Sequence, residues 1–140
     1  MITIKKNISD NSIENRYAKS TPIEHRKKFA QFFTPFPIAN LMAKWVLGNA
    51  NLKNVLEPAF GLGVFSRALL SQNENIEITG FDVDESILES ANTYFGDVKN
   101  VHIHLQDYMY NDWENKYDGS FKNFFIYFEA FNIEILFMRE

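Results

Sequence analysis

The stretch Val55–Ser66 reads VLEPAFGLGVFS and joins three sequence signals. It begins with a short apolar run typical of a buried strand and passes through a loop that contains Gly61 and Gly63. From Val64 to Leu70, apolar residues then follow at helical spacing. We interpret the stretch as strand, glycine loop and helix. Such a loop lets a ligand approach the backbone closely and directs the N–H groups of the helix N-terminus at it.

The same arrangement is repeated along the chain. Residues 76–81 alternate like a strand, residues 86–95 have helical spacing, and residues 101–105 form a third short apolar run. Strands separated by helices of this length form βαβ units, which build a parallel sheet with ligands at the carboxyl ends of its strands. The sequence therefore predicts an α/β fold. An acidic residue stands at or just after the end of each predicted strand: Glu57, Asp82 and Asp107.

The residues before this repeat are of two kinds. Pro35 and Pro37 precede apolar residues at helical spacing, and Gly48 follows them, which predicts a helix over about residues 37–47. Residues 1–28 are mostly polar without a sustained period and are expected to form a partly disordered arm. Its basic run, residues 25–28 (HRKK), either contacts phosphates or forms a solvated face, and the second is the more common for a short run.

Bulk composition restricts the class of protein. With 140 residues and 46% hydrophobic residues, we expect one globular domain. A net charge of −4 provides no global positive field, which disfavours a stand-alone DNA-binding module. The sequence has no apolar run of the roughly 20 residues that span a bilayer and no signal peptide, so a soluble, cytoplasmic protein is expected. The absence of cysteine excludes disulfides, zinc-thiolate sites and thiol catalysis.

The three acids suit an adenosine-containing cofactor. A carboxylate at the end of the second strand, Asp82, can accept hydrogen bonds from both ribose hydroxyls. Glu57, beside the glycine loop, would repel a pyrophosphate but attract the amino and sulfonium groups of S-adenosylmethionine. Asp107 can accept from the adenine amino group while Tyr108 packs on the base. Any one acid alone is as often a solvated strand end, but three in register are harder to explain in that way, and the charge of Glu57 favours the methyl donor over NAD.

Four segments resemble motifs of the adenine-specific DNA methyltransferases of restriction-modification systems. These segments are QFFTP (residues 31–35), LEPAFGLGVF (56–65), GFDVD (80–84) and QDY (106–108). The resemblance covers about residues 29–119 and implies a Rossmann-like class I methyltransferase domain, with a parallel sheet and flanking helices. It also implies S-adenosylmethionine as cofactor and transfer of a methyl group to the exocyclic amine of adenine.

The resemblance assigns roles to individual residues of this chain. It implies that Thr34 and nearby backbone contact the methionine part of the cofactor, that Asp82 holds the ribose and that Val83 packs on adenine. The predicted cofactor-binding residues are Phe33, Thr34, Pro35, Glu57, Pro58, Ala59, Phe60, Gly61, Gly63, Phe65, Asp82, Val83, Asp107 and Tyr108.

The chain departs from the family pattern after Gly119. The family's catalytic motif, Asn/Asp-Pro-Pro-Tyr/Phe, holds the flipped adenine, but no proline follows Pro58. We therefore assign no catalytic residue and expect a fold truncated after three or four strands, inactive by itself, with DNA bound only in a full-length enzyme or complex. A truncated or frameshifted gene fits the change in composition.

Residues 120–140 form an aromatic-rich tail with two interpretations. Phenylalanines at helical spacing favour an amphipathic helix that caps the sheet or engages another chain, in a homo-oligomer or with a partner subunit, and a fourth strand over residues 124–128 is the alternative. Two further functions stay open: a non-catalytic subunit completed by a partner, and a methyltransferase for protein or small molecules. His102 and His104 share a strand face, but a metal site is rejected because no third ligand is evident.

Overall fold

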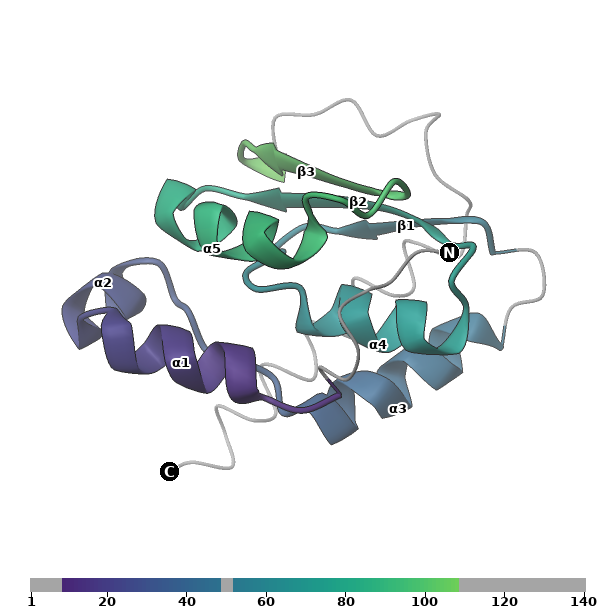
Figure 1. Cartoon of the computed structure of the whole chain (residues 1–140), viewed down its shortest axis with the longest axis horizontal. Helices are drawn as coiled ribbons and strands as arrows, with labels where there is room; N and C mark the ends of the chain where they lie inside the picture. The colour runs from purple at the N-terminus through teal and green to yellow at the C-terminus, as the bar shows by residue number, and fades with distance from the viewer. Residues whose placement is uncertain (1–8, 49–51, 109–140) are drawn as a thin grey trace.

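A three-stranded parallel sheet forms the centre of the molecule (Figure 1). The computed structural model describes residues 9–48 and 52–108. The strands are β1 (Asn54–Glu57), β2 (Glu77–Asp82) and β3 (Val101–Leu105), in the order β1-β2-β3. Glu57 pairs with Gly80, and Asp82 pairs with Leu105. The predicted parallel sheet is confirmed, and its three strands agree with the predicted ranges to within one or two residues.

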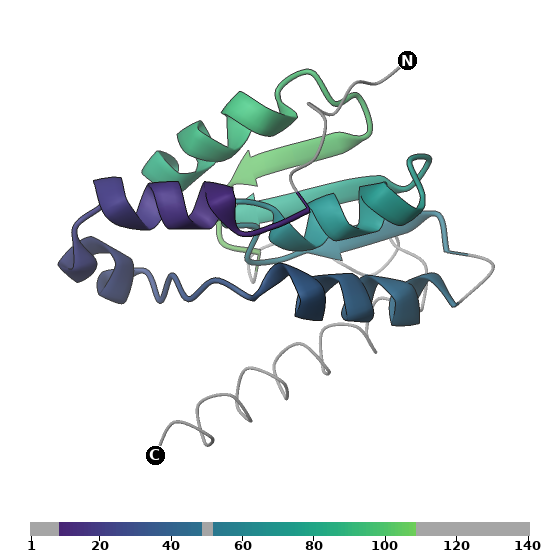
Figure 2. The ribbon, with the colours of Figure 1, turned by 60° about the horizontal axis from the view of Figure 1, so that its bottom comes forward.

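Helices cover one face of this sheet in two layers (Figures 1 and 2). The connecting helices α4 (Val64–Gln72) and α5 (Glu85–Phe95) lie against the strands, and α3 (Phe36–Leu47) packs on α4. All three helices were predicted from their apolar spacing. The α/β class with flanking helices is therefore confirmed.

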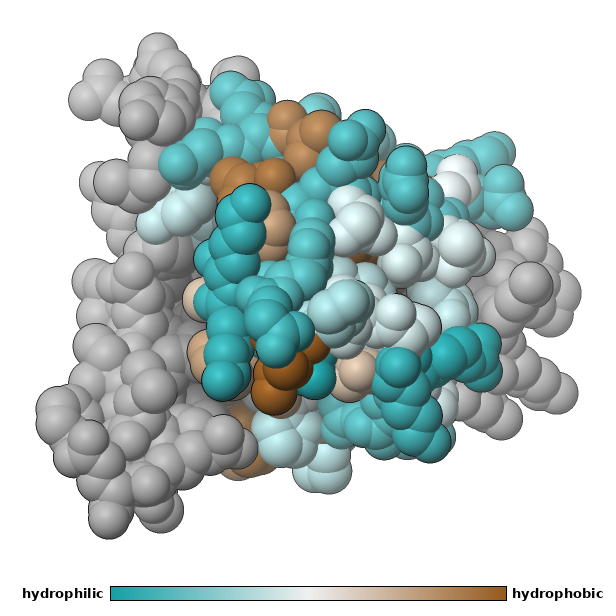
Figure 3. All heavy atoms as spheres, turned by 90° about the vertical axis from the view of Figure 1, so that its left-hand side faces the viewer, coloured by the Kyte–Doolittle hydropathy of each residue, from teal (hydrophilic) through white to brown (hydrophobic). Residues whose placement is uncertain are grey.

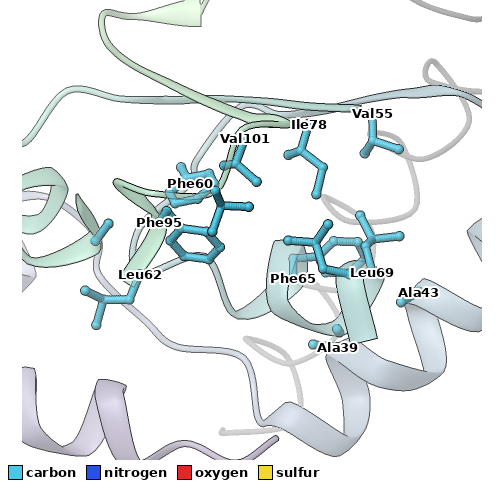
Figure 4. Packing of buried hydrophobic residues seen from close by; sticks show 14 of the residues in the cluster. Ala39, Ala43, Val55, Phe60, Leu62, Phe65, Leu69, Ile78, Phe95 and Val101 are labelled. Atoms are coloured by element: carbon cyan, nitrogen blue, oxygen red, sulfur yellow. The ribbon is translucent and has the colours of Figure 1, made fainter. Parts of the chain in front are cut away.

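The hydrophobic core lies between the sheet and these helices (Figure 4). Val55, Ile78 and Val101, one from each strand, point toward the apolar side of α4. Ala39 and Ala43, one helical turn apart on α3, are fully buried and lie beside α4. Their small side chains allow the two helices to approach closely.

Gly80 is required by the close approach of Phe60. A Cβ atom at Gly80 would lie 2.1 Å from Cδ2 of the Phe60 ring, closer than two carbon atoms can pack. The Phe60 ring lies edge-on to Phe95, with ring centroids 5.2 Å apart. The glycine in β2 thus makes room for an aromatic pair under the glycine loop.

Residues 12–28 differ from the expected arm because they form two helices. Helix α1 (Ser12–Ser20) buries Ile13, Glu14 and Tyr17, whereas α2 (Ile23–Lys28) buries no residue. The buried Arg67 of α4 forms an ion pair with Glu14 and also donates from Nη1 to the carbonyl oxygen of Asp10 at 3.0 Å. Helix α1 is therefore held in place by Arg67, a residue far along the chain, and local periodicity in the sequence cannot reveal such a contact.

Two further expectations concern a membrane span and the C-terminal tail. Within residues 9–48 and 52–108, no helix is long and apolar enough to cross a membrane. The aromatic tail, residues 120–140, lies outside the described residues, and so does the choice between a helix and a fourth strand there.

Candidate functional site

The three predicted acidic positions lie at one edge of the sheet. Glu57 and Asp82 are the last residues of β1 and β2, and Asp107 follows β3 by two residues. All three strand arrows point toward this edge, beside α2 and the start of α5 (Figure 1). The structure thus brings the three motifs together at the carboxyl ends of parallel strands, where open α/β sheets bind ligands.

The glycine loop is tied to the end of β2. Gly61 and Gly63 have φ angles of +54° and +68°, which side-chain-bearing residues rarely adopt. The N–H of Gly61 donates to Oδ2 of Asp82 at 2.8 Å, and the N–H of Phe60 donates to the carbonyl oxygen of Phe81 at 2.8 Å. Among the described residues, the atom nearest to a Cβ built at Gly61 would be Ile87 Cδ1, at the ordinary van der Waals distance of 3.9 Å. Gly61 is half-buried, so a ligand can approach the backbone of the loop there.

The Asp82 carboxylate keeps acceptor capacity on both oxygens. Oδ2 receives the N–H of Gly61, and Oδ1 receives the N–H of Asp84 at 3.1 Å. Each carboxylate oxygen has about two acceptor sites, so each can accept a further hydroxyl group. Asp82 is half-buried, and the adjacent Val83 is 55% exposed. This geometry suits two ribose hydroxyls on Asp82 and a flat apolar base against Val83.

Glu57 is buried beneath the glycine loop. Its side chain accepts a hydrogen bond from the hydroxyl of the buried Ser66, in the first turn of α4. Burial raises the pKa of Glu57 to about 8, against the lowering effects of Ser66 and Arg67. The group is mostly protonated near neutral pH. A nearby cation would favour its ionised form.

The segment after α2 is held by an asparagine from the N-terminal part of the chain. The side chain of Asn11 donates to the carbonyl oxygen of Thr34 at 3.1 Å and accepts from the N–H of Phe36 at 2.7 Å. Because α3 has no side-chain cap of its own, Asn11 supplies the acceptor that its first turn needs. One side chain, that of Asn11, therefore holds the backbone at Thr34 and at Phe36, on either side of Pro35.

A polar network joins α1 and α2 to the start of α5. Tyr17 donates from its hydroxyl to Gln31 at 3.2 Å, and Gln31 donates in turn to Asp84. His25 Nε2 lies 2.7 Å from Oδ2 of the same carboxylate. Burial acts to raise the pKa of Asp84, but hydrogen bonds from His25, Ser86 and Gln31 outweigh it and hold that pKa below its ordinary value. The N-terminal helices thus lie directly beside the Asp82 loop.

The predicted site residues fall into two groups by exposure. The side chains of Phe60 and Phe65 are 2% and 1% exposed and belong to the core, and Pro58 is also buried. Phe33 is half-buried, with its ring edge-on to Tyr17 at 5.9 Å. The other predicted site residues that are exposed or half-buried are Thr34, Pro35, Ala59, Gly61, Asp82, Val83, Asp107 and Tyr108.

Sequence reasoning missed the residues that support the site. Asn11, His25 and Asp84 form contacts across the fold with residues between 23 and 59 positions away in the chain. Only Asp84 carries a local signal, because an aspartate two residues before a serine at a helix start is a common N-cap, and its side chain accepts from the N–H of Ser86. The others become visible only once the elements are packed.

The two strand histidines make other contacts. His102 Nε2 lies 3.1 Å from Glu77 Oε2, and His104 stacks on Phe81 with ring centroids 5.1 Å apart. No group of three or more potential metal ligands occurs among residues 9–48 and 52–108.

The two relatives found by sequence comparison are both methyltransferases. The chain is 68% identical over 119 residues to the type II methyltransferase M.AccI of Acinetobacter calcoaceticus, a match that covers 85% of this chain and 22% of that protein. It is 30% identical over 86 residues to malonyl-[acyl-carrier protein] O-methyltransferase 1 of Ilyobacter polytropus, covering 61% of this chain and 32% of that protein. The chain thus spans about a fifth to a third of these relatives. No family profile matches it.

Solved structures show the same fold at low sequence identity. A proposed RNA methyltransferase of Pyrococcus horikoshii superposes with a TM-score of 0.52 at 18% identity, over 60% of this chain and 44% of that chain. The plantazolicin methyltransferase BpumL, in complex with SAH and a triazolic desmethylPZN analog, gives 0.50 at 18% identity, over 83% and 42%. The class I methyltransferase fold is therefore confirmed, and so is the resemblance of this chain to part of a type II methyltransferase.

Proposed function

We propose that this chain is the S-adenosylmethionine-binding portion of a DNA adenine methyltransferase of a restriction-modification system. The observation that carries the proposal is the Asp82 carboxylate, which is oriented by the N–H of Gly61 and retains acceptor sites for two hydroxyl groups. It lies beside a glycine loop in which the half-buried Gly61 lets a ligand approach the backbone. The similarity to M.AccI, a type II methyltransferase, supports DNA as the substrate of the whole enzyme.

The residues of this site fit the chemistry of that cofactor. Asp82 would hold the ribose, Val83 and Tyr108 would pack on adenine, and Asp107 would accept from its amino group. Glu57 lies at the end of β1, where its ionised form would attract the amino and sulfonium groups. When bound, S-adenosylmethionine supplies the electrophilic methyl group. These side chains bind and orient, and none is assigned to the transfer itself.

The transfer step needs groups that the four motifs do not supply. The sequence contains no Asn-Pro-Pro-Tyr motif to receive the target adenine, so we propose that this chain alone binds cofactor without turnover. DNA and S-adenosylmethionine as reactants imply action in the cytoplasm. We also predict that the aromatic tail, residues 120–140, associates with a second copy of the chain or with a partner chain. Light scattering tests this by measuring the molar mass in solution.

Titration calorimetry with S-adenosylmethionine tests the cofactor site. We expect the wild-type chain to bind and Asp82→Asn to lose at least about tenfold in affinity, because one charge-assisted acceptor is lost. Asp97→Asn is the matched control, since Asp97 is exposed in the turn before β3 at the opposite edge. No heat from the wild-type chain at millimolar cofactor would contradict the proposal, and equal affinities of the two variants would remove Asp82 from the site.

A methyltransferase for a protein-bound or small substrate is the second candidate. The similarity to the O-methyltransferase of Ilyobacter polytropus favours it, but at 30% identity over 61% of the chain, against 68% over 85% for the type II enzyme. The cofactor half of this fold serves many substrates, so the calorimetry does not separate the two candidates. A measurement of duplex DNA binding separates them, because only the DNA methyltransferase is expected to bind DNA.

A further inference from the structure

Helix α2 occupies the site edge without contributing to the core. None of its six residues is buried. It is held by the contact of His25 with Asp84 and by its own C-terminal turn, in which the N–H of Gln31 donates to the carbonyl oxygen of Arg26 at 2.8 Å. A short helix positioned in this way gains little from apolar burial. Lys28 Nζ lies 5.2 Å from the centroid of the Phe29 ring, but both Lys27 and Lys28 are exposed, so their ammonium groups are accessible to an external partner.

The N-terminal helices concentrate positive charge in an otherwise acidic chain. Residues 9–28 contain five Lys or Arg and three Asp or Glu, a formal charge of +2, whereas the whole chain carries −4. The other residues therefore sum to −6. One of the three acids, Glu14, is buried and paired with Arg67. At the end of α2, Lys27 and Lys28 are both exposed.

This charge lies next to the proposed cofactor site. His25 contacts Asp84, whose N–H donates to the Asp82 carboxylate, and α2 leads directly into the segment that contains Thr34. The view onto this side of the molecule shows mainly hydrophilic residues with small hydrophobic areas between them (Figure 3). A base presented to a methyl donor at Asp82 would bring its own strand backbone near α2.

We propose that the basic end of α2, Lys27 and Lys28 with the half-buried Arg26, is a docking surface for the phosphate backbone of duplex DNA. The inference rests on the proposed function, because it takes DNA as the substrate presented at this edge. Lysine ammonium groups bind phosphate as point charges without reading sequence, so this surface would position DNA and leave base recognition to other residues. Docking here is local, which is compatible with a negative net charge.

The test measures DNA binding by the full 140-residue chain with a fluorescently labelled duplex, from low to moderate salt. Charge reversal in Lys27→Glu/Lys28→Glu is compared with Lys44→Glu/Lys99→Glu, which changes the net charge equally at exposed positions on α3 and before β3. We expect the first variant to lose at least about tenfold in affinity and about 2 in the log–log salt slope, since each phosphate contact contributes about 0.9. The control should keep the wild-type slope.

Several results would overturn the inference. One is equal loss in the two charge-reversed variants, and another is a wild-type chain that binds S-adenosylmethionine but no duplex at low salt. Preference for anionic phospholipid vesicles over DNA, abolished by the α2 variant, would assign the surface to a membrane instead.

Calorimetry with S-adenosylmethionine on the same variants keeps the two proposals separate. If the wild-type chain does not bind the cofactor, the proposed function itself is contradicted. If the double Glu variant is unfolded by circular dichroism, Lys27→Gln/Lys28→Gln replaces it.

Discussion

Glu57 is a carboxyl group whose burial sets a pH dependence for folding. Its pKa is raised to about 8 in the folded chain, above the ordinary value of 4.5. Between these two values, the folded state binds more protons than the unfolded state. The contribution of Glu57 to the free energy of unfolding is therefore full below about pH 4.5 and is lost as the pH rises through 8.

We expect Glu57→Gln to be more stable than wild type at pH 9, by about 1–3 kcal/mol, because it removes the cost of a buried charge. At pH 6 Glu57 is protonated in the folded chain but mostly ionised in the unfolded chain, so only part of this cost is present and the difference should be smaller. Urea denaturation at both pH values measures this. Glu89→Gln, at an exposed position of α5, is the control and should show no such difference.

The same residue predicts a pH-dependent cofactor affinity. A carboxyl group that is protonated in the free chain must ionise to attract a cation, so binding should release a proton and strengthen from pH 6 to pH 8. Calorimetry in two buffers of different ionisation enthalpy detects that proton. Glu57→Gln should bind weakly at every pH. An affinity that does not change with pH in the wild-type chain would show that Glu57 stays neutral in the complex.

Ala30 has a backbone conformation that costs free energy. Its φ angle is +50°, in the left-handed region that favours glycine. It follows α2 in a turn where its N–H donates to Lys27 and the N–H of Gln31 donates to Arg26, the hydrogen bonds of a Schellman motif. We expect Ala30→Gly to raise the free energy of unfolding by about 0.5–1 kcal/mol, because the strain is relieved. Ala18→Gly, inside α1, should lower it by a similar amount. Destabilisation by both would contradict this reading of the turn.

At the scale of elements, Asn11 couples α1 to the start of α3. Asn11→Ala removes both hydrogen bonds around Thr34 and Pro35, at a cost of about 1–2 kcal/mol in stability, typical of a lost cap. If Thr34 contacts the cofactor, affinity for S-adenosylmethionine should fall as well. Asn11→Asp keeps the acceptor for Phe36 and loses the donor to Thr34, so it should recover more stability than affinity. The exposed Asn15→Ala is the control, and recovery of both quantities in parallel would make Asn11 purely structural.

The elements differed in how far sequence could predict them. The strands around Val55, Ile78 and Val101 were found because their apolar pattern and glycine loop are local features. The same local pattern correctly placed Glu57 and Asp82 at strand ends. Helices α1 and α2 were missed because long-range polar contacts hold them, and such contacts leave no periodic trace in the sequence.

The site shows the same division between local and long-range information. The sequence predicted the position of Asp82 at the end of β2, but not its hydrogen bonds from the N–H groups of Gly61 and Asp84, and its role in holding the ribose stays a prediction. Phe60 of the glycine loop and Phe65 of α4 were predicted from sequence to contact the cofactor, but their side chains are buried in the core. Only packing distinguishes a residue that lines a loop from one that supports it.

At the scale of the whole molecule, the N-terminal helices and the sheet are joined by a buried ion pair. Arg67 of α4 and Glu14 of α1 are 4% and 2% exposed, so each charge depends on the other for compensation. The arm predicted over residues 1–28 therefore includes a part that is packed into the same core as the sheet. We expect residues 12–28 to unfold together with the strands rather than before them.

A double-mutant cycle on this pair tests that cooperativity. Arg67→Met or Glu14→Gln alone should cost about 3–5 kcal/mol, because each leaves a buried charge without its partner, whereas the double variant should cost much less than their sum. Urea unfolding is followed by circular dichroism and by the fluorescence of Trp45, a probe in α3, in a Trp113→Phe background, and the two signals should give one coincident transition. Additive costs would mean that the two charges are independently solvated. An earlier transition in circular dichroism alone would mean that α1 and α2 form a separate unit, and the basic end of α2 would then not be held rigidly beside Asp82.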